Sequence, residues 1–323
     1  MQPGAGPGWP EATVRMRALP WLLAAGLGAA AGLASLRRRT AALDVRDHLV
    51  GARLLDHADG RLYHRVVGGG PDVVMLPGFG GNSFTWHDVT PPLATRYRVH
   101  WLDLLGHGFS DKPRLGDYTA QAQARRIGDV LTPLAPGRVA VVASSAGAQP
   151  AVALAAHRPE LVAGLVLIDP FLQPGRGLEA ALRAASRVPR ATAVVMRALW
   201  RMPGFAWLGA SLGRHRPWTV DAAVAARQGL TYRTPGFHTT LPALLAGIEP
   251  DACRPLIPQV RCPVLLVWGA SDRSGSGAQA QALASRFADA RFELLPGAGH
   301  LPQEETPEAL LALVEPFLAN LAW

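Results

Sequence analysis

The chain has 323 residues, of which 49% are hydrophobic and 17% charged, and this balance excludes an intrinsically disordered protein. The formal net charge is +8, but almost all basic residues are arginines, with Lys112 as the only lysine, and they are scattered along the sequence. This distribution does not predict the basic stripe of a nucleic-acid-binding face, so we expect no nucleic-acid partner.

The N-terminal part contains an uncharged run over residues 18–36, which as a helix is long enough to cross about 30 Å of hydrocarbon. The basic cluster at 37–39 follows directly, and such clusters tend to stay on the cytoplasmic side. We therefore expect membrane association through a single N-terminal helix, with the rest of the chain in the cytoplasm. Two alternatives stay open. One is a cleaved signal with its small-residue site at 32–34, followed by export, which a start at Met16 would favour; the other is a surface helix.

From about residue 50, strand-like and helix-like segments alternate. Asp59-Gly60 is a two-residue turn between two extended runs and predicts a β-hairpin. Short apolar runs that end in turn residues follow, and they are typical of strands buried on both faces. These runs are DVVMLPG, YRVHWLDLLG, RVAVVAS, LVAGLVLID, PVLLVWG and RFELLPG. Helix-length segments separate most of them, which predicts an α/β fold with a mostly parallel sheet flanked by helices.

The alternation breaks once, between Pro170 and about Pro258, where only helical stretches rich in alanine, arginine and tryptophan occur. A segment of this length is too long for a loop and predicts a helical subdomain inserted after the sixth strand. We therefore expect an N-terminal extension over 1–40, a core over 41–170 and 259–323, and a helical cap over 171–258.

The two cysteines, Cys253 and Cys262, have no further cysteine or histidine at metal-binding spacing. We expect two free thiols rather than a disulfide, and no metal site.

The segment VVASSAGAQP, residues 141–150, places two serines at the end of a predicted strand. A nucleophile on a tight strand-to-helix turn needs small residues two positions before and two after it. Ser145 has Ala143 and Gly147 there, whereas Ser144 has the β-branched Val142 before it. Ser145 is therefore the candidate nucleophile. The alternative interpretation is an ordinary serine at a helix N-cap.

Five motifs, in their order and spacing, resemble the α/β-hydrolase superfamily over roughly residues 50–320. They are VVMLPGFGGNSFTWHD, DLLGHGFSDKP, the serine segment with AAHRPELVAGLVLIDP, CPVLLVWGASD, and GAGHLPQEETPE. The resemblance is closest to esterases, lipases and carbon–carbon bond hydrolases with a helical cap, and it implies the α/β-hydrolase fold.

The resemblance also implies roles for individual residues. Ser145 matches the nucleophile, Asp272 the acid and His300 the base, and this chain order is the one the fold uses. Asp169, at the end of LVLID, is the substitute acid, because some members use that strand end. The implied oxyanion donors are the backbone N–H groups of Phe79 and Ala146.

Pro77 stands where the family often has histidine, but this leaves the main-chain oxyanion donors unchanged. His107 and Asp103 are interpreted as groups that structure their loop. The cap residues Trp200, Met202, Phe205, Trp207 and Trp218 are expected to form the cap core or to line an acyl pocket.

The function that follows is a serine hydrolase that cleaves an ester or related acyl bond of a small, lipophilic substrate, with no metal or organic cofactor. Carbon–carbon bond hydrolysis and perhydrolysis use the same triad and remain alternatives. Serine at position 145 argues against the branches of the superfamily, dehalogenases and epoxide hydrolases, whose nucleophile is a carboxylate. A non-catalytic protein that binds a small ligand on the same fold is the alternative from another class.

Overall fold

The computed structural model describes residues 51–173, 181, 184–185, 187–200, 202 and 204–323. The segment 18–36, for which we predicted a membrane or signal helix, lies outside these residues. Among the described helices, none combines the length and the apolar character that a membrane span requires.

The core is an eight-stranded sheet with the order β1-β2-β4-β3-β5-β6-β7-β8. The hairpin β1–β2 and the pair β2–β4 are antiparallel, and all other neighbours are parallel. The strands are β1 (Ala52–Leu55), β2 (Leu62–Gly68), β3 (Asp72–Leu76), β4 (Arg98–Leu102), β5 (Val139–Ser144), β6 (Val162–Ile168), β7 (Val264–Gly269) and β8 (Ala290–Leu295).

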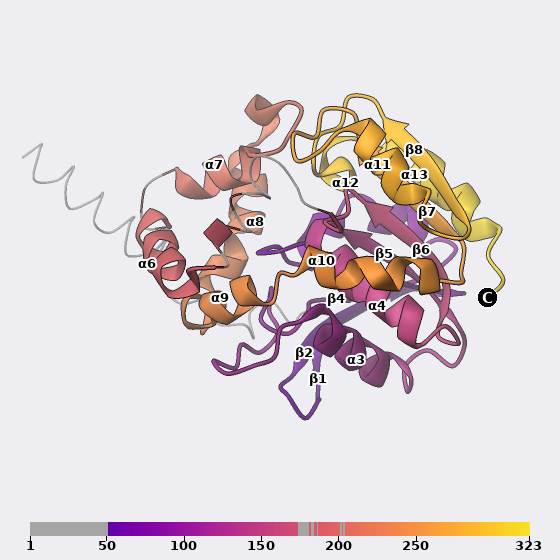
Figure 1. The fold of residues 1–323 in the computed structure, drawn as a ribbon, viewed down its shortest axis with the longest axis horizontal. Helices are drawn as coiled ribbons and strands as arrows, with labels where there is room; N and C mark the ends of the chain where they lie inside the picture. The colour runs from indigo at the N-terminus through magenta and orange to yellow at the C-terminus, as the bar shows by residue number, and fades with distance from the viewer. Residues whose placement is uncertain (1–50, 174–180, 182–183, 186, 201, 203) are drawn as a thin grey trace, which may run out of the picture. The chain divides into compact units, whose positions relative to one another are not determined.

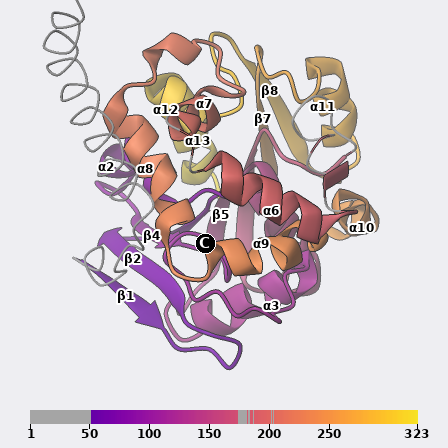
Figure 2. The ribbon, with the colours of Figure 1, turned by 90° about the vertical axis from the view of Figure 1, so that its left-hand side faces the viewer.

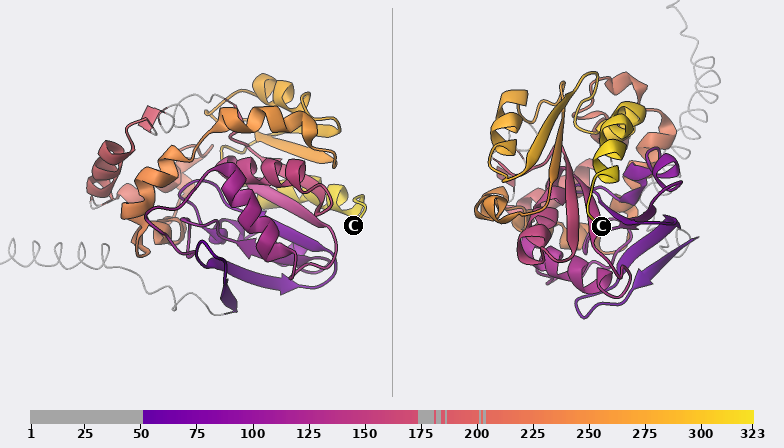
Figure 3. Two further views of the ribbon diagram at one scale, coloured as in Figure 1. Left: turned by 60° about the horizontal axis from the view of Figure 1, so that its bottom comes forward. Right: turned by 90° about the vertical axis from the view of Figure 1, so that its right-hand side faces the viewer.

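Helices cover both faces of this sheet (Figures 1 and 3). Successive residues of the central strands face opposite layers, so both layers are apolar: in β5, Val139 and Val141 join one core cluster and Ala140 and Val142 the other. Helices α3, α4 and α11 pack on the first layer, and α13 packs on the second. The helices of this framework are α2 (Thr90–Leu93), α3 (Ala120–Leu131), α4 (Ala148–His157), α10 (Pro250–Cys253), α11 (Gly277–Ala284), α12 (Pro302–Glu305) and α13 (Pro307–Ala319).

The predicted hairpin and the six predicted strands are confirmed, as is the α/β-hydrolase fold class. One detail differs, because β8 is only partly buried although its sequence suggested burial on both faces. The reason is its place at the edge of the sheet, where a single neighbouring strand, β7, pairs with it.

Between β6 and β7, where we predicted the insertion, the described residues form α6 (Pro189–Leu199), α7 (Phe205–Ser211), α8 (Ala222–Arg233) and α9 (Phe237–Ala246), followed by the short α10. Helix α6 packs against α9, and α7 packs against α8 (Figures 1 and 2). The boundaries of the cap at 171 and 258 stay a prediction, since residues 174–180 lie outside the described residues.

The expectation for the five large apolar residues of the cap is wrong for three of them. Met202, Trp207 and Trp218 are 58%, 45% and 75% exposed, so they belong neither to a core nor to a pocket. Trp200 instead stacks on Tyr232 of α8 with a centroid separation of 3.4 Å, and Phe205 packs edge-on against Trp200. The sequence could not separate these residues, because all five are large apolar side chains in helical segments.

The two cysteines are free thiols, as predicted, and both are buried. Burial raises the pKa of the Cys253 thiol to about 12 and that of Cys262 to about 11, so neither is a thiolate at neutral pH.

A buried chain of polar groups crosses the sheet near its antiparallel edge. His100 on β4 contacts Asp72 Oδ1 through Nε2 at 2.7 Å, and its Nδ1 lies 2.9 Å from His64 Nε2 on β2. Arg98 also binds Asp72. Burial lowers the pKa of His64 to about 3, and it lowers the pKa of His100 in spite of Asp72. Both imidazoles are therefore neutral in the fold at neutral pH.

This arrangement predicts that acid destabilises the fold. A histidine whose folded pKa lies below its unfolded value of about 6.5 costs stability as pH falls from about 6.5 toward the folded pKa. For His64 alone, the loss between pH 7 and pH 5 is about 2 kcal/mol. We expect His64→Gln to show a correspondingly smaller decrease in urea unfolding free energy over this range. The exposed His87→Gln variant is the control, and equal pH dependence in both variants would contradict the assignment.

Candidate active site

The strand-to-helix turn after β5 holds Ser145 in a left-handed backbone conformation, with φ of 51°. A non-glycine residue there is strained and persists only where its surroundings fix it. Gly147 explains part of this constraint, because a Cβ on it would lie 2.5 Å from the carbonyl oxygen of Pro77. The small residue two positions after the serine is thus required by close contact.

Ser145 and not Ser144 meets the predicted base. Ser145 Oγ lies 2.9 Å from His300 Nε2, and His300 Nδ1 lies 2.7 Å from Asp272 Oδ2. With Nδ1–H donating to the carboxylate, Nε2 is left to accept the serine proton. Ser144, by contrast, is buried and lies 3.5 Å from Gln303 Nε2. The structure therefore brings all three predicted triad residues together.

Asp272 lies in the turn after β7, with its side chain almost fully buried. The backbone N–H of Ser274 donates to Oδ1 at 2.9 Å and the Ser274 hydroxyl to Oδ2 at 2.8 Å. Burial alone would raise the pKa of Asp272, but the hydrogen bonds and charge of His300 and the bonds from Ser274 outweigh it and lower that pKa. Asp272 is therefore ionised at neutral pH. The sequence interpretation did not identify Ser274 as its partner.

Asp169, the substitute acid, lies beside this pair but does not replace Asp272. It is fully buried at the end of β6, its φ is 44°, and its Oδ1 accepts the N–H of Gly269 at 2.9 Å. Its Oδ2 has no hydrogen-bond partner among the described residues. Burial raises the pKa of Asp169 well above its usual value, and the nearby Asp272 charge adds to this effect. The Asp169 carboxyl therefore holds its proton more tightly than an exposed aspartate does, next to the ionised Asp272.

Asp169, Asp272 and His300 each offer a ligand atom within 4.8 Å of the others. These donors do not fit a metal site, however, because both ring nitrogens of His300 already face Asp272 and Ser145. The cluster is better described as part of the same hydrogen-bonded array.

The loop that carries His300 is fixed from two sides. Gly213, in the insertion, accepts the N–H of His300 at 2.8 Å. Glu305 accepts the N–H groups of Gly299 and Leu301 through Oε1, and that of His215 through Oε2 at 2.7 Å. The insertion and the loop of the base therefore hold each other in place.

A buried ion pair strengthens this junction. Glu304 contacts the Arg214 guanidinium, and it also accepts the Gln228 amide at 2.8 Å and the Thr85 hydroxyl at 2.5 Å. The sequence interpretation missed this pair, since the two residues are 90 positions apart and no local motif relates them.

His107 and Asp103 structure their loop, as interpreted. Asp103 is fully buried and accepts the N–H groups of Ser83 at 2.7 Å and Phe109 at 2.8 Å. His107 Nδ1 lies 3.2 Å from the carbonyl oxygen of Leu105, and burial lowers the pKa of His107 to about 4.

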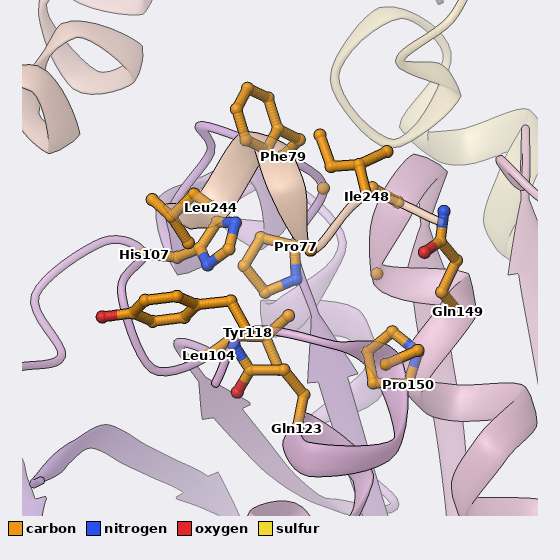
Figure 4. Close-up of a pocket in the computed structure, with 15 residues that line it drawn as sticks. Pro77, Phe79, Leu104, His107, Tyr118, Gln123, Gln149, Pro150, Leu244 and Ile248 are labelled. Atoms are coloured by element: carbon orange, nitrogen blue, oxygen red, sulfur yellow. The ribbon is translucent and has the colours of Figure 1, made fainter. Parts of the chain in front are cut away.

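A pocket of about 390 Å³ adjoins the strained turn (Figure 4). Phe79 and Ala146, the predicted oxyanion donors, both line it. Their loops are in close contact, because a Cβ on Gly78 would lie 3.0 Å from the Ser145 Cβ. Most other lining residues are apolar, including Leu104, Leu244, Ile248 and Pro150.

The two amide side chains that line this pocket are already engaged. Gln123 Nε2 donates to the carbonyl of Leu105 at 2.8 Å, and Gln149 Nε2 donates to the carbonyl of Phe171 at 2.9 Å. The pocket therefore suits an apolar group more than a charged one.

Comparison with known proteins agrees with this geometry. The family profile described as alpha/beta hydrolase fold matches residues 71–307. An uncharacterised protein of Mycobacterium tuberculosis is 30% identical over 272 residues, which cover 79% of this chain and 77% of that protein. The 2-(acetamidomethylene)succinate hydrolase of Mesorhizobium japonicum is 28% identical and matches 84% of this chain and 96% of its own. An alpha/beta hydrolase fold protein of Burkholderia ambifaria has a TM-score of 0.70 and 25% identity, and it covers 85% of this chain and 98% of its own.

The two carboxyl groups should respond differently to the same substitution. We expect Asp272→Asn to lower kcat by about 10⁴, because the amide no longer orients His300 or stabilises its charged form. Asp169→Asn keeps the shape of the side chain and an oxygen that can accept the Gly269 N–H, so kcat should change by less than about tenfold. Steady-state hydrolysis of a p-nitrophenyl ester measures both effects. If Asp169→Asn lowered kcat more than Asp272→Asn, Asp169 rather than Asp272 would be the partner of His300.

The buried ion pair should contribute strongly to stability. We expect Arg214→Met to lower the free energy of unfolding by about 3 kcal/mol, since it leaves Glu304 buried without its cation. Arg216→Met, two residues along and exposed, is the matched control, with an expected change within about 0.5 kcal/mol. Urea unfolding of both variants tests the difference, and equal losses would show that the pair has no special role.

Proposed function

Since this chain belongs to the alpha/beta hydrolase fold family, we propose that it is a serine hydrolase that cleaves an ester or related acyl bond through an acyl-Ser145 intermediate. The observation that carries this proposal is the 2.9 Å contact between Ser145 Oγ and His300 Nε2, with Asp272 on the opposite ring nitrogen. A serine hydroxyl is a weak nucleophile until a base takes its proton, and this arrangement supplies the base.

The proposed reaction has two halves. Ser145 Oγ attacks the carbonyl carbon while its proton passes to His300 Nε2, and Asp272 stabilises the resulting imidazolium. The backbone N–H groups of Phe79 and Ala146 are the proposed donors to the oxyanion. Collapse of the intermediate breaks the bond to the leaving alcohol, which takes the proton from His300.

Water completes the cycle. It attacks the acyl carbon, and its proton passes to His300. The second tetrahedral intermediate then collapses, releasing the carboxylic acid and returning the proton to Ser145 Oγ. No step in this sequence calls for an organic cofactor or a metal ion.

The pocket supports a small, lipophilic substrate. Its apolar lining and its engaged amides favour an uncharged hydrocarbon part. We propose an ester with a short or medium acyl chain.

The proposal is tested by reacting the full chain with a fluorophosphonate, whose phosphorus an activated serine attacks with loss of fluoride. We expect one adduct, on Ser145, located by peptide mass spectrometry. Ser145→Ala should not react, and Ser144→Ala, the neighbouring control, should react as the parent does. His300→Ala should react at least 10²-fold more slowly, because the base is gone.

A folded chain that forms no adduct on Ser145 would contradict the proposal, and a small-ligand-binding protein on this fold would then be the better interpretation. The carbon–carbon hydrolase and perhydrolase alternatives predict the same adduct, so analysis of the products formed by the unlabelled enzyme separates them from an esterase.

A further inference from the structure

The exposed large apolar side chains of the described residues are concentrated in one part of the chain. Eight of the twelve lie between residues 188 and 218, whereas the other four, Val66, Leu115, Leu294 and Trp323, are scattered. Such a concentration within one insertion makes it the candidate interaction surface of the described residues, because exposed apolar residues elsewhere occur singly. We call these eight residues the cap face: Val188, Val194, Val195, Met202, Trp207, Leu208, Leu212 and Trp218.

Helix α6 packs one side against α9 and exposes the other. Ala193 is buried and Met196 and Trp200 are partly buried on the side that packs against α9. Val194 and Val195 within α6 are exposed, and so are Val188 just before the helix and Met202 just after it. Helix α7 packs against α8 and leaves Trp207, Leu208 and Leu212 exposed. Figures 1 and 2 show both helices in the part of the insertion remote from the sheet.

The same segment has a one-sided charge. Residues 180–220 contain seven arginines and neither aspartate nor glutamate, while the net charge of the whole chain is +8. These arginines are Arg183, Arg187, Arg190, Arg197, Arg201, Arg214 and Arg216. Of these, Arg187, Arg190, Arg197 and Arg216 are exposed, and Arg214 is paired with Glu304. Among the described residues of α6, exposed valines therefore alternate with the exposed Arg190 and Arg197, for which no ion pair within the described part of the chain is found.

We propose that the cap face docks on an anionic lipid bilayer. A segment that combines valine, leucine and tryptophan with arginine, and has no acidic residue between Glu179 and Asp221, matches the chemistry of a membrane interface. There the apolar groups enter the acyl boundary and the arginines meet lipid phosphates. Exposed tryptophans fit this environment, since their rings are apolar and their N–H groups are polar.

A second copy of the chain is a poorer occupant of this face. A two-fold interface would place the same surface on both sides and bring two sets of arginines together without any acid in the segment to neutralise them. The arginines therefore favour a negatively charged partner, and the exposed apolar side chains favour a lipid.

Docking of the cap face does not depend on the proposed hydrolase activity, but it would change what lies near the pocket. Helix α9, against which α6 packs, contributes Leu244 to the pocket lining. A docked cap face would thus place the covering of the pocket close to the lipid, where lipophilic molecules are concentrated.

The binding test uses the full chain with sedimented vesicles of phosphatidylcholine alone or mixed with phosphatidylglycerol. We expect binding to the mixed vesicles, and at least about tenfold weaker binding for the double variant Arg190→Gln/Arg197→Gln. Trp218→Ser should weaken binding in the same direction. The matched controls are Arg291→Gln and Leu294→Ser, which change an exposed arginine and an exposed leucine on β8. Urea unfolding midpoints establish that all variants are folded.

A local probe separates the cap face from the N-terminal segment, which is identical in every variant. A polarity-sensitive dye is attached to Val195→Cys or, as control, to Leu294→Cys, while the native cysteines are protected by burial. We expect a blue shift on mixed vesicles at position 195 and none at position 294.

Equal binding of the double variant and the parent, or an unshifted dye at position 195, would overturn the proposal. So would binding of the parent to polyglutamate but not to vesicles, which would make the face a docking site for an acidic protein.

Discussion

The left-handed backbone at Ser145 is the constraint on which the rest of the site depends. A φ of 51° turns the chain sharply from β5 into the following helix and presents the hydroxyl to His300. The turn closes only because Gly147 lies against Pro77 and Gly78 lies against Ser145 itself. The same contacts bring the loop that carries Phe79 next to the nucleophile, so one strained residue determines where the pocket begins.

The insertion covers the site and also holds the loop of His300 in place. Gly213 accepts the N–H of His300, His215 donates its N–H to the Glu305 carboxylate that holds the same loop, and Arg214 meets Glu304 between them. Tyr232 of α8 is stacked on Trp200 and lies against Gly80, next to the loop of Phe79. Residues 213–215 and the Trp200–Tyr232 pair therefore connect the insertion to the loops around the nucleophile. The exposed sides of α6 and α7 take no part in these contacts.

The sequence predicted the features that depend on neighbours along the chain. The strands follow from apolar runs that end in turns, and the choice of Ser145 over Ser144 follows from the sizes of Ala143 and Gly147. Features that depend on distant residues were not predictable. The Arg214–Glu304 pair joins positions without a common motif, the raised pKa of Asp169 depends on burial, and the exposure of Trp218 depends on how the cap helices pack.

The central claim is that His300 turns the strained Ser145 into a nucleophile that carries an acyl group. The most direct measurement is acid quenching of the full chain during turnover of p-nitrophenyl butyrate, followed by mass spectrometry of the Ser145 peptide. We predict a butyryl ester on Ser145 that disappears when the substrate is exhausted. Release of p-nitrophenol at the full catalytic rate, with the Ser145 peptide unmodified at every time point, would contradict the claim.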